Sequence, residues 1–324
     1  MTHPKNKYAL VADIGGTNTR VALADGHKIL GETIRRYSNA DYPDLETVLR
    51  RYIDDEGGVD PIAACVAVAG PVRDGRATMT NLDWTIDKDT LARATNAETV
   101  AILNDLQAQG HALGYLDDAN IRTIIDGPTG LPNAARLVVG VGTGFNAAPV
   151  FDTDQGRLVT PSESGHANLP IRNQRDLRLS QFACDSHGFP AVEEVLSGRG
   201  LERVYAFLAK ESGTSAQAKA KEIMGACADG SDPRATETAQ LFTQILGTVC
   251  GNLSLVQLPF GGVYLVGGVA RAFAPFLTEF GFANAFKDKG RFAGFMGNFR
   301  VCVIEDDYAA LTGSAAHLVA LSNH

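Results

Sequence analysis

Short apolar runs alternate with amphipathic stretches along the first hundred residues. Residues Leu45, Val48, Leu49 and Ile53 recur at helical spacing within Pro43–Ile53, and Leu106–Leu113 also has a helical pattern. The apolar runs around these segments predict strands at Tyr8–Ala12, Val21–Leu23, Leu30–Tyr37, Ala63–Ala69 and Val100–Leu103. Strands that alternate with helices predict a sheet with parallel members, covered by helices.

The rest of the chain repeats this alternation and adds a long helical stretch. Strands are predicted at Arg136–Gly140, Gly262–Val266 and Arg300–Ile304, and a closing helix at Tyr308–Leu321. Residues 170–257 are mostly helical in pattern, and one face of Glu237–Val256 is apolar enough for a long core helix. No low-complexity linker interrupts the chain, so any domain boundary lies inside compact structure. We place the two crossings between domains near residues 107 and 304. The prediction is a small domain of residues 1–107 plus 305–324 and a large domain of residues 108–304.

One strand-turn-strand pattern occurs twice. Residues Asp13–Asp25 contain a strand end, a Gly/Thr turn and a second strand. Residues Gly140–Asp152 repeat this pattern when the two segments are aligned without a gap, so that Leu23 matches Val150. A single glycine-rich turn between strands is common, whereas two copies in the same order indicate an internal duplication.

The length and charge of the chain limit the classes of function. Its 324 residues are enough for two domains, and its formal net charge of −8 argues against nucleic acid as a partner. The apolar runs are far shorter than the about 20 residues of a membrane span. The N-terminal residues lead directly into the first predicted strand, so we expect neither a signal peptide nor a membrane partner.

Five cysteines occur without any Cys-x-x-Cys spacing. An odd number of cysteines, several of them in apolar surroundings, predicts reduced and buried thiols in a cytoplasmic protein. The same spacing argues against a structural zinc site, and no residue is predicted as a metal ligand.

Three glycine-rich turns follow predicted strands: Gly15-Gly16-Thr17, Gly142-Thr143-Gly144 and Gly267-Gly268. Glycine allows the backbone to approach a phosphate closely, and threonine adds a hydroxyl donor beside the amides. None of these turns has the spacing of a P-loop or of a Rossmann dinucleotide site. Two facing hairpins and a third turn would suit a triphosphate held in a cleft between domains.

These turns belong to a series of segments that resembles the bacterial glucokinase family, within the hexokinase, actin and Hsp70 superfamily. The segments follow the order and spacing of that family from Asp13 to about Leu318: Asp13–Asn18, Thr80–Trp84, Leu103–Asp105, Gly142–Gly144, Glu163–His166, Glu193–Gly198, Gly261–Gly268 and Phe286–Phe292. The resemblance implies an α/β protein with the two-domain actin-like (ribonuclease H-like) ATPase fold. Duplicated strand-hairpin-strand phosphate loops and an active-site cleft between the domains belong to that expectation.

The resemblance also implies roles for the matching residues. Asp105 matches the catalytic base, Asn104 matches a ligand of a sugar hydroxyl, and the other sugar hydroxyls would be bound by Glu163, His166 and Glu193. ATP with Mg²⁺ would be bound by Asp13, Gly15, Gly16, Thr17, Asn18, Thr143, Gly144, Gly267 and Gly268. Such an enzyme phosphorylates the 6-hydroxyl of glucose, the first step of glycolysis, and a homodimer is expected.

The chemistry of these residues agrees with the implied roles. An alcohol is a poor nucleophile until a positioned carboxylate accepts its proton, and Asp105 directly follows a predicted strand, where active sites of open sheets lie. Carboxylates, an amide and a histidine supply the donors and acceptors that a polyol needs. The alternative for Asp105 is the N-cap of the helix that follows, and Glu163 and His166 could be ordinary exposed loop residues.

The chain departs from the family at two positions. Asn146 and Ser164 stand where the family usually has glycine. Asparagine tolerates a positive φ better than other non-glycine residues. We therefore expect the second turn to keep its shape with asparagine at position 146.

Three other kinds of protein share parts of this pattern. The first is a kinase for another hexose or an amino sugar. The second is a sugar-sensing transcription regulator on a related scaffold, which needs a DNA-binding helix-turn-helix, and only seven residues precede the first predicted strand. The third is a non-catalytic actin-like assembly protein or chaperone ATPase, which would have no use for the combination of Asp105, Glu163, His166 and Glu193.

Overall fold

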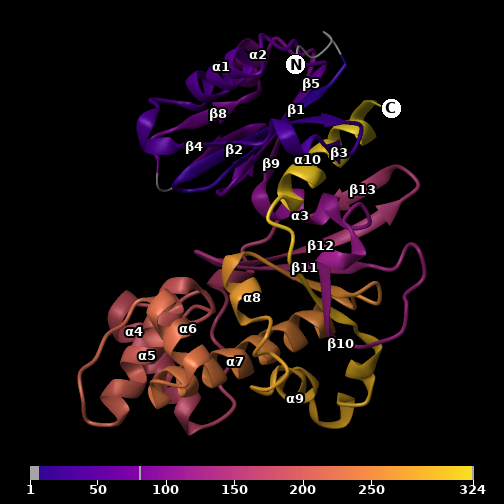
Figure 1. The fold of residues 1–324 in the computed structure, drawn as a ribbon. Coiled ribbons are helices and arrows are strands. Elements are labelled where there is room, and N and C mark those ends of the chain that lie inside the picture. The colour runs from indigo at the N-terminus through magenta and orange to yellow at the C-terminus, as the bar shows by residue number, and fades with distance from the viewer. Residues whose placement is uncertain (1–6, 80–81, 323–324) are drawn as a thin grey trace. The chain divides into compact units, whose positions relative to one another are not determined.

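The structure of the protein, a computed structural model, describes residues 7–79 and 82–322. Thr80 and Asn81 of the family-like segment Thr80–Trp84 therefore lie outside the described residues. The chain divides into two compact units, which Figure 1 allows the reader to follow by colour. The first unit contains Met1–Asp118, Asp154–Val159 and Asp306–His324, and the second contains Ala119–Thr153 and Thr160–Glu305.

The sheet of the first unit has a parallel centre. Its strand order is β3-β2-β1-β5-β9, with β4 also paired to β2: β1 (Ala9–Ile14), β2 (Asn18–Asp25), β3 (Lys28–Ile29), β4 (Arg35–Ser38), β5 (Ala63–Val68) and β9 (Thr99–Asn104). Strands β1, β5 and β9 are parallel, whereas β1 and β2 form an antiparallel hairpin. A small separate sheet contains β6 (Val72–Arg73), β7 (Arg76–Thr78) and β8 (Thr85–Asp87).

The predicted strand over Leu30–Tyr37 is wrong in its first half. Residues Gly31–Thr33 form a 3₁₀ turn, and the strand β4 begins only at Arg35. The hydroxyl of Thr33 accepts a hydrogen bond from the N–H of Leu23 at 3.0 Å and donates one to the carbonyl of Leu30 at 2.7 Å. These side-chain bonds replace strand pairing locally, and an apolar run carries no signal for them.

Helices cover both faces of the first sheet: α1 (Leu45–Asp55), α2 (Lys88–Thr95), α3 (Asp105–Ala112) and α10 (Ala309–Ser322). Leu10 and Ile14 of β1 lie in the core that α1 and α2 share, whereas Val11 lies in the core beneath α3 and α10. This division follows from the two-residue period of a strand. Figure 1 shows α1 and α2 on one side of the sheet and α10 on the other.

The sheet of the second unit also has a parallel centre. Its strands run in the order β10-β15-β14-β11-β12: β10 (Ile121–Ile125), β11 (Arg136–Val141), β12 (Phe145–Thr153), β14 (Val263–Val266) and β15 (Val301–Ile304). Strands β11, β14 and β15 are parallel, and β10 and β12 are antiparallel to their neighbours. The helices of this unit are α4 (Gln174–His187), α5 (Gly198–Glu211), α6 (Ala220–Asp229), α7 (Pro233–Gln257), α8 (Gly268–Phe273) and α9 (Phe282–Lys287).

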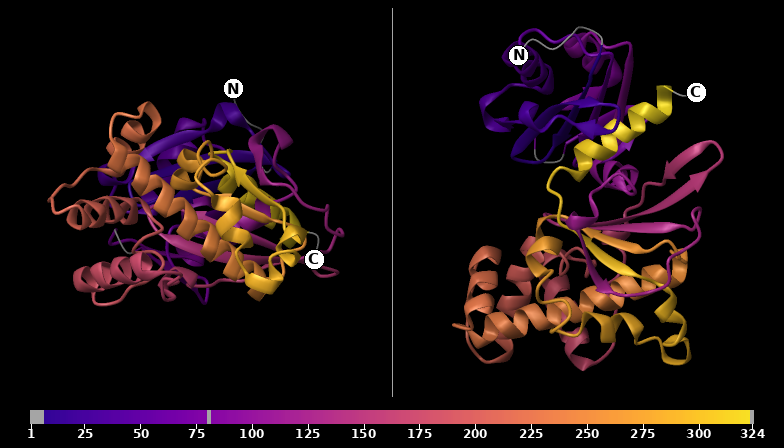
Figure 2. Two further views of the ribbon diagram at one scale, coloured as in Figure 1. Left: turned by 90° about the horizontal axis from the view of Figure 1, so that it is seen from below. Right: turned by 45° about the vertical axis from the view of Figure 1, so that its right-hand side comes forward.

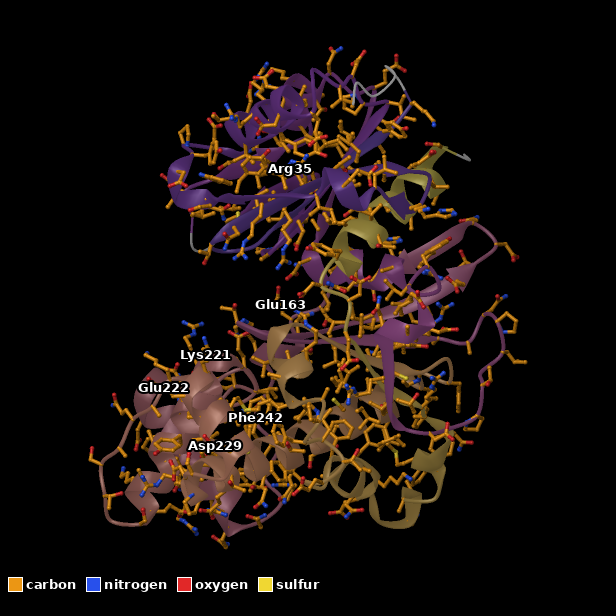
Figure 3. The ribbon with its side chains drawn as sticks, in the orientation of Figure 1. Arg35, Glu163, Lys221, Glu222, Asp229 and Phe242 are labelled. Carbon is orange, nitrogen blue, oxygen red and sulfur yellow. The ribbon has the colours of Figure 1, made fainter. Side chains whose placement is uncertain are left out.

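Helix α7 is the central helix of the second unit. Phe242 of α7, labelled in Figure 3, stacks on Phe273 of α8 with ring centroids 4.4 Å apart. Helices α5, α6 and α9 pack against α7, and Figure 2 shows the group from two sides. By length and composition α7 could cross a membrane, but 67% of its most apolar stretch is buried inside the protein, as in the core helix of a soluble domain.

The segment around β13 (Gly156–Val159) is grouped with the first unit. Arg157 donates to the carbonyls of His111, at 3.0 Å, and of Leu113, at the C-terminal end of α3. The side chain of Gln107 in α3 donates to the carbonyl of Val159 at 3.0 Å. Through α3 and β13, the first unit thus contains residues 108–118 and 154–159, which the predicted boundaries place in the large domain.

The duplicated hairpins β1–β2 and β11–β12 have the same pairing but turns of different length. Ile14 pairs with Thr19 across the first turn, which leaves four residues between them, whereas Val141 pairs with Phe145, which leaves three. The ungapped match of Leu23 to Val150 is therefore wrong. Leu23 corresponds to Pro149, because these residues pair with the equivalent positions Leu10 and Leu137.

Candidate active site

The first predicted phosphate turn and Asp105 lie at the same edge of the first sheet. Ile14 at the end of β1 pairs with Val68 of β5, and Val68 pairs with Asn104 at the end of β9. The turn begins directly after Ile14, and Asp105 directly follows Asn104. Neighbouring strands are about 4.8 Å apart, so the two strand ends lie about 10 Å apart.

Asn104 caps helix α3, so the N-cap alternative for Asp105 is wrong. The side-chain oxygen of Asn104 accepts from the N–H of Leu106 at 3.0 Å, and the N–H of Asn104 donates to Gln107 Oε1 at 3.1 Å, which completes a capping box. The side-chain amide of Asn104 donates to the carbonyl of Gly70 at 2.9 Å. Asp105 is half-buried in the first helical turn, where its Oδ1 also accepts from Leu106.

The first turn depends on Asn39, a residue that no sequence pattern indicates. Asn39, only 2% exposed, donates from its side chain to the carbonyl of Gly15 at 2.8 Å and from its backbone to the carbonyl of Thr17 at 2.9 Å. Its side-chain oxygen accepts from the hydroxyl of Thr19 at 2.8 Å. These bonds hold the turn while Gly16 and the side chain of Thr17 stay exposed. An asparagine after β4 has no pattern that would reveal this contact.

Asp13 is a carboxyl group whose ionised form the fold stabilises only in part. It is paired across the first hairpin with Arg20, and Arg20 Nη1 lies 3.5 Å from Asp13 Oδ2. Burial raises the pKa of the Asp13 carboxyl above its usual value, and Arg20 opposes this shift without cancelling it. A further cation beside Asp13 would stabilise its ionised form.

The second turn is fixed by the chain around Glu193. The N–H of Gly142 donates to the carbonyl of Gly144, and the N–H of Gly198, at the start of α5, donates to the carbonyl of Gly142, both at 2.9 Å. Glu193 Oε2 accepts from the N–H of Phe145 at 2.9 Å. A Cβ atom on Gly144 would collide with the Glu193 carboxylate, so a larger residue at this position would have to displace that side chain. Thr143 is exposed at the tip of the turn.

The third turn lies against the same edge of the second sheet. Gly140 pairs with Val266, which brings Gly267 beside Val141 at the base of the second turn. Gly267 has a φ of 102°, and a Cβ atom there would lie 2.6 Å from the carbonyl oxygen of Val141. The two glycine-rich turns of this unit thus meet at one edge.

Glu163, His166 and Glu193 come together in the second unit. Glu163 precedes a 3₁₀ turn, Ser164–His166, and accepts on its carbonyl from the N–H of His166 at 3.1 Å. The N–H of Glu193 donates to the carbonyl of Gly165 at 2.9 Å, which joins the two segments. Glu193 is half-buried, whereas Glu163, labelled in Figure 3, and His166 are exposed.

Asn146 does not use the positive φ that asparagine tolerates. Positive φ at described non-glycine residues is confined to Asp74, Asn96 and Leu258, and Asn146 lies within strand β12, paired with Gly140. Asn146 acts through hydrogen bonds of its side chain, and its backbone has the ordinary conformation of a strand. Its oxygen accepts from the N–H of Ser164 at 3.0 Å, so the two departures from the family pattern touch each other.

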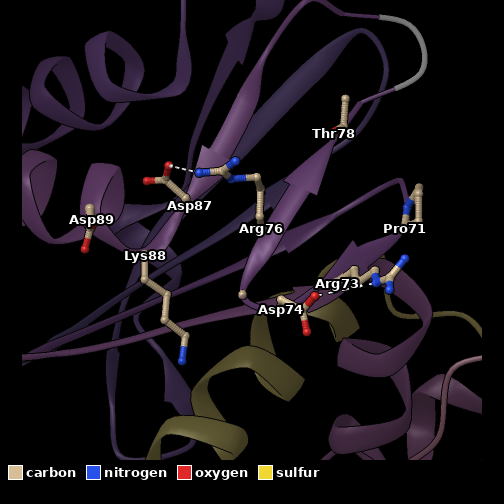
Figure 4. Close-up of a pocket in the computed structure, with 9 residues that line it drawn as sticks. Pro71, Arg73, Asp74, Arg76, Thr78, Asp87, Lys88 and Asp89 are labelled. Carbon is tan, nitrogen blue, oxygen red and sulfur yellow. Dashed lines mark ion pairs between the residues drawn. The ribbon is translucent and has the colours of Figure 1, made fainter.

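A pocket of about 620 Å³ in the first unit does not include any predicted site residue. Its lining, drawn in Figure 4, is Pro71, Arg73, Asp74, Gly75, Arg76, Thr78, Asp87, Lys88 and Asp89. Arg76 pairs with Asp87 at 3.7 Å, and Arg73 pairs with Asp74 at 3.5 Å. Since basic and acidic residues balance in this lining, it has no charge selectivity for a phosphate.

The cysteines are free thiols. Cys65, Cys227, Cys250 and Cys302 are buried, and burial raises the pKa of Cys65 and of Cys250 to about 12. Within residues 7–79 and 82–322, no group of three or more His, Cys, Asp or Glu side chains could hold a metal ion.

Comparison with known proteins identifies the family. A family model described as Glucokinase matches residues 10–321. A glucokinase from Saccharophagus degradans is 36% identical over 313 residues, which cover 95% of this chain and 97% of that protein. The structure of a glucokinase from an Antarctic psychrotroph is 31% identical, has a TM-score of 0.85, and matches over 97% of this chain and 99% of that one.

A more distant structure shares the fold. A ROK family glucokinase from Streptomyces griseus, in complex with glucose and AMPPNP, is 20% identical with a TM-score of 0.63, over 96% of this chain and 98% of that one. Together with the psychrotroph enzyme, this match confirms the expected α/β fold of the actin-like ATPases.

Proposed function

Since this chain belongs to the glucokinase family, we propose that it transfers the γ-phosphoryl group of ATP to the 6-hydroxyl of glucose. The assignment of residues rests on the strand pairing of Ile14 with Val68 and of Val68 with Asn104. This pairing brings the first glycine-rich turn and Asp105 to one edge of the sheet. A carboxylate and a phosphate-binding turn at such an edge fit phosphoryl transfer to an alcohol.

Asp105 acts as the general base in this proposal. Its carboxylate accepts the proton of the 6-hydroxyl while that oxygen forms a bond to the γ-phosphorus and the bond to the β-phosphate oxygen breaks, which releases ADP. The capping box at Asn104 holds the start of α3, and so the backbone of Asp105, in place. Asn104 uses one amide hydrogen for Gly70 and one lone pair for Leu106, which leaves capacity for a sugar hydroxyl.

Glu163, His166 and Glu193 bind the other hydroxyls of the sugar. An ionised carboxylate has about four lone-pair sites, so Glu193 can accept from a hydroxyl in addition to the N–H of Phe145. Asp105 belongs to the first unit, and these three residues belong to the second.

The glycine-rich turns bind the phosphates of ATP. Backbone amides at Gly16, Asn18, Gly144, Gly267 and Gly268, with the hydroxyls of Thr17 and Thr143, supply the donors. The N–H of Gly15 instead closes the first turn by donating to the carbonyl of Asn18 at 3.0 Å. Mg²⁺ neutralises phosphate charge when bound with ATP, and oxygen ligands suit it. Asp13 fits as its carboxylate ligand, because burial leaves the ionised Asp13 incompletely compensated.

We also propose a location in the cell and an oligomeric state for this protein. Free, mostly buried cysteines support a cytoplasmic location. A homodimer, and the absence of nucleic acid or membrane partners, also belong to the proposal.

A coupled assay for ADP release tests the function. We expect ADP release that depends on glucose, with ATP alone giving only a background rate. The product should resist hydrolysis in dilute acid, as authentic glucose 6-phosphate does, and should be oxidised by glucose-6-phosphate dehydrogenase. Equal or higher kcat/KM with an amino sugar, or ADP release that is independent of sugar, would contradict the proposal.

Replacing Asp13 with asparagine should separate stability from activity. Because the pKa of the Asp13 carboxyl is raised in the folded state, the folded protein binds the proton of this carboxyl more tightly than the unfolded chain does. The contribution of Asp13 to the free energy of unfolding is therefore fully present below the unfolded pKa of 3.8 and is lost as the pH rises above it. At pH 7.5 we expect the unfolding midpoint of Asp13→Asn to equal or exceed that of the parent, an advantage that disappears near pH 3.8. We expect kcat/KM for MgATP to fall about 10-fold or more, as for lost metal-site residues.

Asp25→Asn is the matched control, since Asp25 lies in the same hairpin but is exposed. It should leave both the midpoint and kcat/KM nearly unchanged. A large loss of stability in Asp13→Asn at pH 7.5, with activity lost in proportion, would show that Asp13 serves only the fold.

A further inference from the structure

The side chain of Asn146 binds both peptide groups that flank Glu163. Its amide nitrogen donates to the carbonyl of Ser162, and its oxygen accepts from the N–H of Ser164 at 3.0 Å. The hydroxyls of Ser162 and Ser164 each lie 3.1 Å from the same oxygen. One half-buried side chain thus holds the backbone on either side of a glutamate whose own side chain is exposed.

Asn146 is itself held in a fixed strand. It is the second residue of β12 and is paired with Gly140 of β11. Its oxygen also accepts from the N–H of Ala147 at 2.8 Å, which restricts the side-chain rotation. The hydroxyl of Ser162 donates to the carbonyl of Ala147, so that Ser162 is tied to the same strand.

The start of β12 holds Glu193 as well as Glu163. Phe145, the residue before Asn146, donates its N–H to Glu193 Oε2 at 2.9 Å. Two consecutive residues of one strand therefore position two carboxylates, one through its own oxygen and the other through the peptides around it. The same strand follows directly on the Gly142–Gly144 turn.

We propose that Asn146 is a positioning residue that sets the orientation of Glu163 toward the sugar, with Ser164 as its partner. Glycine at position 146 would remove every one of these side-chain bonds, and glycine at position 164 would keep only the backbone one. The pair therefore holds the Glu163 segment by side-chain bonds that glycine at both positions could not make. This inference rests on the proposed role of Glu163 in binding the sugar.

A positioning role predicts a change in KM for glucose with little change in kcat. Without Asn146 the peptides around Glu163 lose their partners, so the glutamate samples orientations that do not bind the sugar. We expect Asn146→Ala to raise KM for glucose about 10-fold. The kcat and the KM for ATP should change by less than about 2-fold, because Asp105 and the phosphate turns are intact.

Steady-state kinetics of a small set of variants tests this inference. Asn298→Ala is the matched control, because Asn298 is also half-buried, and its side-chain amide also donates to a backbone carbonyl, that of Phe295, at 2.8 Å. It should leave KM for glucose unchanged. Ser164→Ala keeps the N–H that donates to Asn146 and should raise KM less than Asn146→Ala does.

The double variant Glu163→Gln/Asn146→Ala shows whether the two residues act together. If Asn146 acts through Glu163, the loss of Asn146 should add less than about 3-fold to the KM of Glu163→Gln. Should Asn146→Ala fail to fold, Asn146→Asp replaces it, since this variant keeps the acceptor oxygen and loses the donor to Ser162, and it should also raise KM for glucose.

The outcomes separate this inference from the function on which it rests. If Glu163→Gln leaves KM for glucose unchanged, the assignment of Glu163 to the sugar is wrong. If Glu163→Gln raises KM but Asn146→Ala, or Asn146→Asp in its place, does not, Asn146 has no positioning role. Fully independent effects in the double variant would also overturn the inference.

Discussion

Replacing Asp105 with asparagine should lower kcat for glucose phosphorylation by about 10²-fold or more. Asparagine has nearly the size of aspartate but cannot accept the proton of the 6-hydroxyl, so the nucleophile stays a neutral alcohol. The N-cap of α3 should survive, because Asn104 makes the capping box. We therefore expect the unfolding midpoint and the affinity for ATP, measured by equilibrium titration, to remain close to those of the parent.

Asp89→Asn is the control for this experiment. Asp89 occupies the first turn of α2, as Asp105 occupies the first turn of α3, so this variant also removes a negative charge from a helix N-terminus. It should leave kcat unchanged. A near-normal kcat in Asp105→Asn would remove Asp105 from the mechanism, and a loss of ATP binding would assign Asp105 to the nucleotide.

The second large effect is expected on kcat/KM for the sugar. Glu163→Gln and His166→Ala should each lower kcat/KM for glucose by about 5- to 150-fold, which corresponds to the roughly 1–3 kcal/mol cost of an unpaired polar group in a binding site. The affinity for ATP should stay nearly the same, because the phosphate turns are different segments. The same cost predicts that moving one hydroxyl, as in mannose or galactose, lowers kcat/KM of the parent by a comparable factor.

The measurement is kcat/KM for glucose, mannose, galactose and glucosamine with the parent and both variants. Glu279→Gln, at an exposed glutamate of the second unit, controls for the loss of a carboxylate and should change none of the values. The assignment of Glu163 and His166 is wrong if the parent uses the four sugars equally. It is also wrong if the variants lose ATP binding and keep the use of sugar.

Much of the fold follows from local patterns. The helical spacing of Leu45, Val48 and Leu49 places α1, and the apolar face of α7 makes it a core helix, because burial depends on residues a fixed distance apart in the chain. The glycines of the three turns likewise mark strand ends, because each glycine-rich turn directly follows an apolar run in the sequence. The candidate residues Asp105, Glu163, His166 and Glu193 were found through their resemblance to family segments, since no periodicity distinguishes them.

The one-residue difference between the duplicated turns could not be read from the sequence. Gly15–Asn18 and Gly142–Gly144 have similar composition, and only the pairing of Ile14 with Thr19 and of Val141 with Phe145 shows which residues leave the ladder. The sequence also could not decide whether Asn104 or Asp105 is the N-cap of α3. Both are good capping residues, and the extended conformation of Asn104, with φ −66° and ψ 149°, decides between them.

By itself, the sequence determined the parallel strands of both sheets, the helices α1, α3, α7 and α10, the repeated hairpin and the set of residues that could carry the chemistry, because these depend on local spacing or on short segments. Only the tertiary structure decided what Asn39 and Asn146 do. Asn39 reaches Gly15 across 24 residues of sequence, and Asn146 reaches Ser164 across 18. Hydrogen bonds between side chains and distant backbone groups depend on where the chain folds back, and no pattern of hydrophobic and polar positions records that.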